Sequence, residues 1–475
     1  MIHRSIQQIN DMVNGKLVKE KYVSQGMIKG VSIDTRSIAP GNLFVPIKGE
    51  RFNGHQFLAD AVKSGAAAAL WCEDEPMPAE GIPLIIVKDT LEAIQQLAKE
   101  YRRQLPVKVI GVTGSNGKTS TKDILAALLG TQYRTQKTTG NLNNHLGVPL
   151  TLLSLAENTE MAVVEMGMSG LGEIKLLSTI ASPNAAIITN ISEAHLTELK
   201  TKEMILQAKL EILSGLRENG LFIYNGDDPY LSRECRILSM LAELSSSPVL
   251  QIATFGCGAD NDIAPASCTV EKQGVTFTLQ GEESCPPFFL PMLGKHQMYN
   301  ALAAAAAAKH FGVSYDNIRQ GLLQVEATGM RNELIEVKHL TIMNDSYKSN
   351  PTSLRAALDT LYQLTGYQQK FVVLGDMNGI GNEMETIRSH REIGEELDAE
   401  QISCLFTIGS LAEHIASAAK KHFPEERIFS FQEQERDELI AKLKMLLTEE
   451  TIVLVKSSRK LQLENIVNTL LKSTA

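Results

Sequence analysis

Apolar residues in the middle of the chain fall into short continuous runs separated by segments of helical periodicity. The runs VKVIGV (107–112), MAVVEM (161–166) and AAIITN (185–190) are typical of strands buried on both faces of a parallel sheet. Between the first two, KDILAALLG (122–130) repeats its apolar residues at helical spacing. This alternation predicts an α/β unit.

The same alternation resumes after about residue 325. Strand-like runs such as LTIMND (340–345), FVVLGD (371–376) and TIVLVK (451–456) alternate with helical segments such as SLRAALDTLYQL (353–364). The pattern predicts a second parallel sheet, doubly wound and Rossmann-like.

The first hundred or so residues differ, because they mix short strands with turn signals such as Ala39-Pro40-Gly41. They end in a helical stretch at 91–104, and Pro106 then marks a boundary. Domains usually contain about 100 to 200 residues, so a chain of 475 residues is expected to form three. The predicted domains are a mixed α/β domain, a parallel-sheet domain and a Rossmann-like domain, at residues 1–105, 106–325 and 326–475.

Composition and charge limit the classes of function. The net charge is -9 and no long basic run is present, which disfavours nucleic acid as a partner. The N-terminal segment lacks the apolar core of a signal peptide, and the longest apolar run, 301–308, is too short to span a membrane. This alanine-rich run is instead predicted to form a close-packed helix. The six cysteines form no CxxC pair and fit reduced thiols, so we expect a cytoplasmic protein without membrane insertion.

A phosphate-binding loop is predicted between the strand at 107–112 and the helix that follows. Glycines let backbone amides approach phosphate oxygens, and the helix N-terminus adds positive potential. Lys118 would reach the terminal phosphates and Thr119 would hold Mg²⁺. The strict GxxxxGK[ST] pattern has glycine where this chain has Val112, but the strand, loop and helix favour a functional loop over a plain tight turn. The predicted loop comprises Thr113, Gly114, Ser115, Asn116, Gly117, Lys118 and Thr119.

Two further polar residues are expected at the same edge of the sheet. Glu165 ends one predicted strand, and His195 follows the strand at 185–190 by a few residues. Carboxylates suit Mg²⁺, but imidazole is a less usual ligand. The residue pattern alone therefore leaves open whether His195 is a metal ligand or a side chain that makes a local hydrogen bond. Lys209 lies in QAKLEIL, where periodicity alone predicts a solvated helix lysine.

Segments across the whole chain resemble the Mur ligase family. They include TGSNGKTSTKD (113–123), GNLNNHLGVPLTLL (140–153), EMGMSGLGEI (165–174) and NDSYKSNPTSLRAAL (344–358). The resemblance is strongest to the members that join D-alanyl-D-alanine to UDP-N-acetylmuramoyl-tripeptide in peptidoglycan synthesis. It implies a ligase that uses ATP and Mg²⁺ and activates a carboxylate as an acyl phosphate. We expect a monomer, although the sequence itself leaves the oligomeric state open.

The resemblance also assigns roles to individual residues. It implies that Lys118, Glu165, His195 and Lys209 are catalytic. Thr119, Glu165 and His195 match metal positions, and Lys209 matches a lysine that can carry a carbamate and then act as a further ligand. The nucleotide is expected at Asn300 and Arg331 and its ribose at Asp345, while the tripeptide end of the substrate is expected near Asn143 and Asn144.

In the first domain, VSIDTRSIAPGNLFVPIKGERFNGHQF (31–57) resembles a segment that holds the uridine nucleotide in the family. Its polar residues are also typical of plain turns between strands. The candidate residues are Asp34, Thr35, Arg36, Asn53, Gly54 and His55.

The chain departs from the family pattern in several places. Asn53 and Asn344 stand where aspartate is expected, Lys348 where asparagine is expected and Ser457 where glycine is expected. These departures leave open a catalytically inactive nucleotide-binding regulator, and the phosphate loop alone leaves open a Mur-type ligase that adds a diamino acid. A dehydrogenase is disfavoured, because Met384 stands at the third glycine position of the dinucleotide fingerprint.

Overall fold

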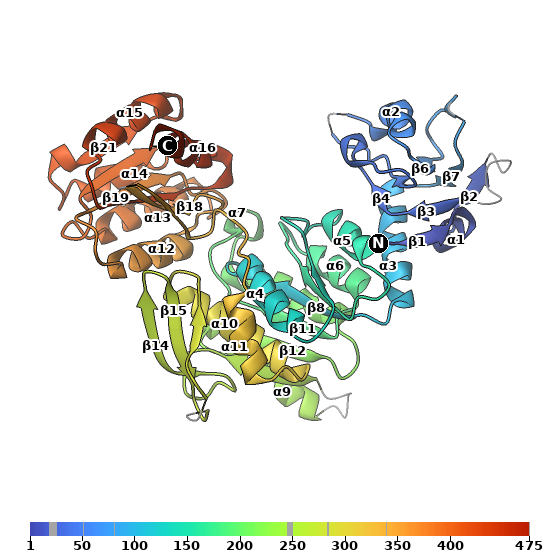
Figure 1. The fold of residues 1–475 in the computed structure, drawn as a ribbon, viewed down its shortest axis with the longest axis horizontal. Helices are drawn as coiled ribbons and strands as arrows, with labels where there is room; N and C mark the ends of the chain where they lie inside the picture. Colours follow the sequence, from blue (N-terminus) through green and yellow to red (C-terminus); the bar gives the residue numbers. More distant parts are fainter. Residues whose placement is uncertain are drawn as a thin grey trace.

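The computed structural model describes residues 1–18, 26–50, 52–79, 81–244, 250–282, 285–338 and 340–474, without the side chains of 237–244, 473 and 474. The chain forms an α/β protein of three domains, with the central domain between the other two (Figure 1). No helix within these ranges has the length and apolar character needed to cross a bilayer.

The N-terminal domain contains a five-stranded sheet with the order β2-β7-β6-β5-β4, in which only β2 runs antiparallel to its neighbour. Its strands are β2 (Lys16–Val18), β4 (Val31–Ser32), β5 (Leu43–Phe44), β6 (Ala68–Cys72) and β7 (Leu84–Val87). Outside this sheet lie the pair β1 (His3–Ser5) and β3 (Met27–Lys29), the helices α1 (Ile6–Met12) and α2 (Leu58–Lys63), and the short 3₁₀ turns η2 (Thr35–Ser37) and η3 (Gly54–Phe57).

The helix α3 (Thr90–Gln104) connects the first two domains, as the apolar periodicity of 91–104 predicts. It packs against β6 on one side and against α5 (Gly147–Ser154) and α6 (Glu173–Ala181) of the central domain on the other. Its buried side chains belong to a hydrophobic core that continues from the first domain into the second. The first domain is therefore fastened to the central sheet by a shared core.

The central domain is built on six parallel strands in the order β13-β12-β11-β8-β10-β9. The predicted strands are β8 (Lys108–Thr113), β10 (Met161–Glu165) and β11 (Ala185–Ile188), joined by β9 (Thr135–Lys137), β12 (Leu221–Asn225) and β13 (Gln251–Phe255). The surrounding helices are α4 (Lys118–Gly130), α7 (Leu196–Leu199), α8 (Lys202–Leu210) with the 3₁₀ turn η4 (Glu211–Gly215), α9 (Pro229–Leu244), α10 (Lys295–His310) and α11 (Tyr315–Leu323), in addition to α5 and α6. All eight alanine-rich positions from 301 to 308 in α10 are buried, which confirms the close-packed helix.

One part of the central domain departs from the predicted α/β pattern. A three-stranded antiparallel sheet, β14-β15-β16, follows the parallel strands. Its strands are β14 (Pro265–Glu271), β15 (Gly274–Leu279) and β16 (Phe288–Leu290). The alternation of exposed and buried residues in β14 and β15 belongs to a sheet with one solvated face, which a search for continuous apolar runs misses.

The C-terminal domain is a six-stranded sheet with the order β17-β18-β22-β19-β20-β21, parallel except for the edge strand β17. Its strands are β17 (Glu333–Val337), β18 (Leu340–Asp345), β19 (Gln369–Gly375), β20 (Cys404–Ile408), β21 (Ile428–Phe431) and β22 (Thr451–Lys456). Separate cores on its two faces confirm the doubly wound sheet. The helices are α12 (Pro351–Gln363), α13 (Glu383–Glu396), α14 (Glu413–Ala419), α15 (Arg436–Leu446) and α16 (Glu464–Thr474).

Candidate active site

The phosphate loop leaves β8 at Thr113 and enters α4 at Lys118. Gly114 and Gly117 both have positive φ, at +147° and +80°, a backbone conformation that favours glycine. A Cβ atom at Gly114 would also collide with Thr189, and one at Gly117 would collide with Asn300. The segment after β11 holds the loop in place, because Asn190 Oδ1 accepts a hydrogen bond from the Asn116 backbone amide at 3.0 Å.

The Lys118 side chain folds back over this loop. Its Nζ donates to the carbonyl oxygens of Gly114 at 2.6 Å and Ser115 at 3.3 Å. Loss of hydration lowers the pKa of the Lys118 ammonium, although the nearby Glu165 carboxylate opposes this shift. Carbonyl oxygens are weak partners for an ammonium, so phosphate oxygens would compete for it effectively.

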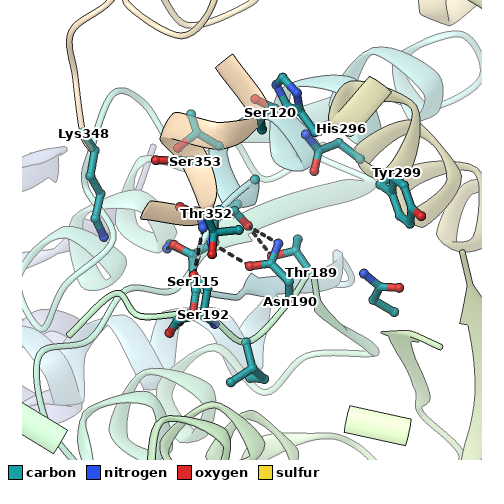
Figure 2. Close-up of a pocket in the computed structure, with 18 of the residues that line it drawn as sticks. Ser115, Ser120, Thr189, Asn190, Ser192, His296, Tyr299, Lys348, Thr352 and Ser353 are labelled. Carbon is teal, nitrogen blue, oxygen red and sulfur yellow. Dashed lines mark hydrogen bonds between the residues drawn. The ribbon is translucent and has the colours of Figure 1, made fainter. Parts of the chain in front are cut away.

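A cavity of about 790 Å³ opens between the central and C-terminal domains, next to the phosphate loop (Figure 2). Thr113 is fully buried, and neither it nor Gly114 lines the cavity, so these two residues shape the loop rather than contact the space above it. The other residues predicted for the ATP site and the tripeptide end line the cavity: Ser115, Asn116, Gly117, Lys118, Thr119, Asn143, Asn144, Glu165, His195, Lys209, Asn300, Arg331 and Asp345.

Glu165 lies beside the phosphate loop because β10 pairs with β8, with Glu165 opposite Val112. Its Oε1 accepts a hydrogen bond from Asn143 Nδ2 at 2.7 Å, while the buried Oε2 has no hydrogen-bond partner among the described residues. Lys122 Nζ lies 4.0 Å from Oε2. A buried carboxylate oxygen without a hydrogen bond fits a cation site.

The described residues contain no cluster of three or more His, Cys, Asp or Glu side chains that could hold a metal ion by itself. Mg²⁺ often takes only one or two protein oxygens and completes its shell with phosphate oxygens and water. Glu165 and the buried Thr119, at the start of α4, fit that kind of site.

His195 is the residue before α7 and has a positive φ of 69°. Its Nε2 accepts a hydrogen bond from Lys348 Nζ at 3.5 Å, across the boundary between the central and C-terminal domains. Burial, together with the positive charges of Lys348, Lys118 and Lys209, lowers the pKa of His195 to about 3. The imidazole is therefore neutral, and a metal ion at Nε2 would require Lys348 to turn away.

Lys209 is almost completely buried, at 1% exposure, so the solvated lysine predicted from periodicity alone is wrong. The helix α8 buries Ile205, Leu206 and Ala208 as well, and Lys209 lines the cavity instead of the protein surface. Burial and the nearby Lys118 and Lys348 charges place the pKa of Lys209 well below its usual value. A lowered pKa favours the neutral amine, which is the form that reacts with CO₂ to give a carbamate.

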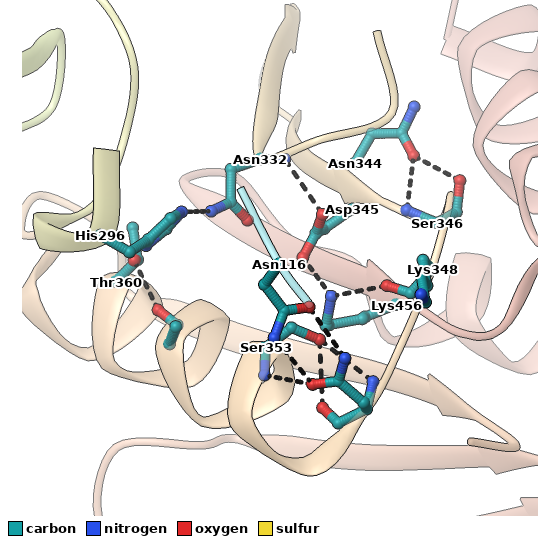
Figure 3. A network of polar contacts seen from close by, with 12 residues as sticks. Asn116, His296, Asn332, Asn344, Asp345, Ser346, Lys348, Ser353, Thr360 and Lys456 are labelled. Atoms are coloured by element: carbon teal, nitrogen blue, oxygen red, sulfur yellow. Dashed lines mark hydrogen bonds and ion pairs between the residues drawn. The ribbon is translucent and has the colours of Figure 1, made fainter. Parts of the chain in front are cut away.

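Arg331 and Asp345 line the cavity from the C-terminal side, and Figure 3 shows Asp345 in a network of polar contacts. The Arg331 guanidinium stacks over the Tyr347 ring at 4.1 Å, and its buried Nη1 has no hydrogen-bond partner in the described part of the chain. Asp345 is paired with Lys456 at 2.5 Å, yet burial raises the pKa of its carboxyl group. Asn300 accepts a hydrogen bond from Thr121 at 3.3 Å, which ties α10 to α4.

Some residues around the cavity had no signal in the sequence. Asn350 is the N-cap of α12 and also bonds to Asn116 of the phosphate loop. Asp123, buried in α4, accepts hydrogen bonds from the backbone and hydroxyl of Thr328, at 3.0 and 2.7 Å, in the connection to the C-terminal domain. Such pairs join residues about 200 positions apart, so periodicity could not find them.

The uridine candidates lie in the N-terminal domain and do not line this cavity. Asp34, the N-cap of η2, is paired with the exposed Arg36 at 2.6 Å, and this pair holds the pKa of Asp34 down to about 2. Asn53 caps η3, in which Gly54 packs so closely on Ile47 that a Cβ would clash. Thr35 lies in η2, and His55 accepts a hydrogen bond from the Cys72 amide at 3.2 Å.

Family models match three stretches of the chain. Residues 27–102 match the model described as Mur ligase family, catalytic domain, residues 112–308 match the Mur ligase middle domain, and residues 330–459 match the Mur ligase, glutamate ligase domain. The chain belongs to the Mur ligase family. The matches cover all three domains of this Mur ligase.

Relatives and solved structures agree over the full length of this Mur ligase. A protein of Bacillus subtilis named UDP-N-acetylmuramoyl-tripeptide--D-alanyl-D-alanine ligase is 45% identical over 474 residues, which is 100% of this chain and 99% of the relative. A crystal structure of MurF from Acinetobacter baumannii matches with a TM-score of 0.86 and 31% identity, over 99% of both chains. MurF ligase from Thermotoga maritima in complex with ADP matches with a TM-score of 0.80 and 26% identity, over 94% of this chain and 97% of that one.

Proposed function

We propose that this Mur ligase joins D-alanyl-D-alanine to UDP-N-acetylmuramoyl-tripeptide at the expense of ATP, and so makes the UDP-muramyl-pentapeptide precursor of peptidoglycan. One observation of the site carries the proposal. Lys118, Lys209 and Lys348 line one cavity beside the phosphate loop, where burial lowers the pKa of each, the charge of Lys118 lowers the pKa of the other two further, and Glu165 is the nearby carboxylate. Three lysines gathered beside a phosphate loop favour an anionic ligand, and a triphosphate on the loop would provide one.

The residues around the cavity support transfer of the terminal phosphoryl group to a carboxylate. A carboxylate cannot acylate an amine directly, because the leaving group would be oxide. Lys118 and the loop amides would neutralise charge on the phosphoryl oxygens as the carboxylate attacks phosphorus and ADP leaves. Mg²⁺, when bound at Thr119 and Glu165, supplies further charge neutralisation. The amine of D-alanyl-D-alanine would then displace phosphate from the acyl phosphate.

The arrangement of the domains supports binding of the two ends of the long substrate by different domains. We assign the uridine nucleotide to Asp34, Thr35, Arg36, Asn53, Gly54 and His55 of the N-terminal domain, which lies at the end of the molecule away from the C-terminal domain (Figure 1). The tripeptide end would reach Asn143 and Asn144, which line the cavity beside Glu165. Residues 1–105, 106–325 and 326–475 are the proposed domains, and the protein would act as a cytoplasmic monomer.

A product assay tests the function. Purified protein is incubated with UDP-N-acetylmuramoyl-tripeptide, D-alanyl-D-alanine, ATP and Mg²⁺, and the products are identified by mass spectrometry. We expect the pentapeptide nucleotide, ADP and phosphate, with phosphate release that requires both the tripeptide nucleotide and D-alanyl-D-alanine. A product that forms only with a free diamino acid would overturn the proposal, and so would ATP binding without any ligation.

A further inference from the structure

Lys348 belongs to the C-terminal domain but reaches the central cavity. It lies in the loop between β18 and α12, and this loop is held at both ends. Lys456 Nζ donates to the Lys348 carbonyl at 2.9 Å, and Asn350 bonds to Asn116 of the phosphate loop at 2.8 Å. The backbone of Lys348 is thus fixed against the phosphate loop, and Figure 2 shows its side chain at the edge of the cavity.

The Lys348 ammonium lacks an anionic partner in the described part of the chain. Its one hydrogen bond there goes to the neutral His195 imidazole, at the long distance of 3.5 Å. An ammonium that is half-buried and paired with a neutral group is costly, because burial removes hydration that no carboxylate replaces. Two of its three donors remain available for a ligand.

The charge near Lys348 also favours an anionic ligand. Lys348 and Lys118 line the same cavity, and the positive charge of Lys118 repels the Lys348 ammonium there. Lys118 is the residue of the phosphate loop expected at the terminal phosphates. Because Lys348 Nζ lies 3.5 Å from His195 Nε2, and Asn350 of the same loop bonds to Asn116 of the phosphate loop, we expect Lys348 at the terminal phosphate end of the cavity rather than at the nucleoside end.

We propose that Lys348 is a further catalytic residue, whose ammonium binds the terminal phosphoryl group of ATP while this group moves to the substrate carboxylate. The inference rests on the proposed function. A carboxylate oxygen forms the new bond to phosphorus, the bond from phosphorus to the bridging oxygen breaks, and ADP leaves with the electron pair. Lys348 keeps its proton and neutralises charge on the non-bridging oxygens throughout.

This role accounts for the lysine at a position where the family resemblance predicts asparagine. An amide can donate a hydrogen bond to phosphate, but an ammonium adds a full positive charge that strengthens the bond. In moving to the phosphoryl oxygens, Lys348 would release His195 Nε2, which then becomes available to a metal ion. The docked C-terminal domain would in this way deliver a cation to the reacting group, as an arginine finger does in other phosphoryl-transfer enzymes.

The test compares Lys348→Gln and Lys348→Arg with the wild type, and Lys460→Gln serves as the matched control because Lys460 is an exposed lysine of the same domain. Calorimetry measures binding of ADP and of a non-hydrolysable ATP analogue in Mg²⁺, and steady-state assays measure kcat and KM. For Lys348→Gln we expect about tenfold weaker analogue binding, ADP binding within about threefold of wild type, and kcat lower by about 30-fold or more. Lys348→Arg should recover most of the analogue binding, and Lys460→Gln should behave as wild type.

Two results would overturn the proposal. One is wild-type analogue binding and turnover in Lys348→Gln, and the other is an equal loss of ADP and analogue binding, which would indicate a structural role. Thermal unfolding of each variant verifies that it folds. Should the wild type make no pentapeptide product, the proposed function fails, but the comparison of ADP with the analogue still decides whether Lys348 contacts the terminal phosphate.

Discussion

The side chains of Asn116 and Asn350 hydrogen-bond to each other in both directions, with Asn350 Nδ2 donating to Asn116 Oδ1 at 2.8 Å and Asn116 Nδ2 donating to Asn350 Oδ1 at 3.4 Å. Asn116 belongs to the phosphate loop, and Asn350 is the N-cap of α12 in the C-terminal domain. The pair therefore links the position of the C-terminal domain to the loop that would hold ATP.

This link predicts different effects for two substitutions of Asn350. Serine can still cap α12 but is too short to reach Asn116, whereas alanine can do neither. Both variants should bind the ATP analogue about three- to tenfold more weakly, as expected for the loss of one or two net hydrogen bonds. Asn350→Ala should in addition lower the free energy of unfolding by about 1 kcal/mol, the usual worth of an N-cap.

Calorimetric titration and denaturant unfolding separate the two contributions. Wild-type analogue affinity in Asn350→Ser would show that the amide pair has no part in nucleotide binding. Equal unfolding free energies in the two variants would show that capping by Asn350 contributes nothing measurable.

Lys118 should matter more than any other single side chain of the loop. Removing a preorganised charge partner of a developing oxyanion costs on the order of 10² to 10³ in rate, so Lys118→Ala should lose at least about 10² in kcat. The matched control is Lys175→Ala, at an exposed position of α6. Pentapeptide formation is measured at saturating ATP for both variants, and near-normal turnover by Lys118→Ala would remove this lysine from the mechanism.

Lys209 should form a carbamate. Burial and the nearby lysine charges lower the pKa of Lys209, which favours the neutral amine that reacts with CO₂, and the carbamate anion would find Lys118 and Lys348 close by. We expect a carbamate carbon signal by NMR in protein supplied with ¹³C-bicarbonate, and we expect Lys209→Met to lose it. A wild-type spectrum without this signal at saturating bicarbonate would contradict the prediction.

The sequence predicted those parts of the fold whose strands are buried on both faces. Runs such as 161–164 and 452–455 are apolar throughout because helices cover both sides of these sheets. The half-solvated strands β14 and β15 carry only an alternating pattern, which continuous apolar runs do not reveal.

The candidate site divides in the same way. Lys118, Thr119 and Glu165 follow directly from strand ends and loop chemistry, because the carboxyl ends of parallel strands share one edge. The family resemblance was needed for residues such as Lys209 and Asn300. Helical periodicity predicts the wrong exposure for Lys209 and says nothing about the role of Asn300. The contact between Lys348 and His195 depends on the placement of one domain on another, and no local pattern in the sequence encodes it.

His296 should make the stability of the protein depend on pH. It lies in α10 and accepts a hydrogen bond from Asn332 Nδ2 at 2.8 Å, in the connection to the C-terminal domain (Figure 3). Burial, and then the charge of Lys456, lower the pKa of His296 to about 4. Below about pH 6.5 this histidine binds a proton in the unfolded chain, whereas in the folded protein it stays neutral until about pH 4. The free energy of unfolding therefore decreases as the pH falls through this window.

Two variants measure how much His296 contributes to the pH dependence of stability. Between pH 7.5 and pH 5, linkage gives a loss on the order of 2 kcal/mol from His296 alone. In His296→Gln, glutamine can still accept the Asn332 hydrogen bond but does not titrate, so the fall in unfolding free energy over the same interval should be smaller by about that amount. His3→Gln, at an exposed position, is the control and should keep the wild-type pH dependence. Denaturant unfolding at both pH values is the measurement, and an identical decline in His296→Gln and wild type would mean that the imidazole is not held neutral at the junction of the two domains.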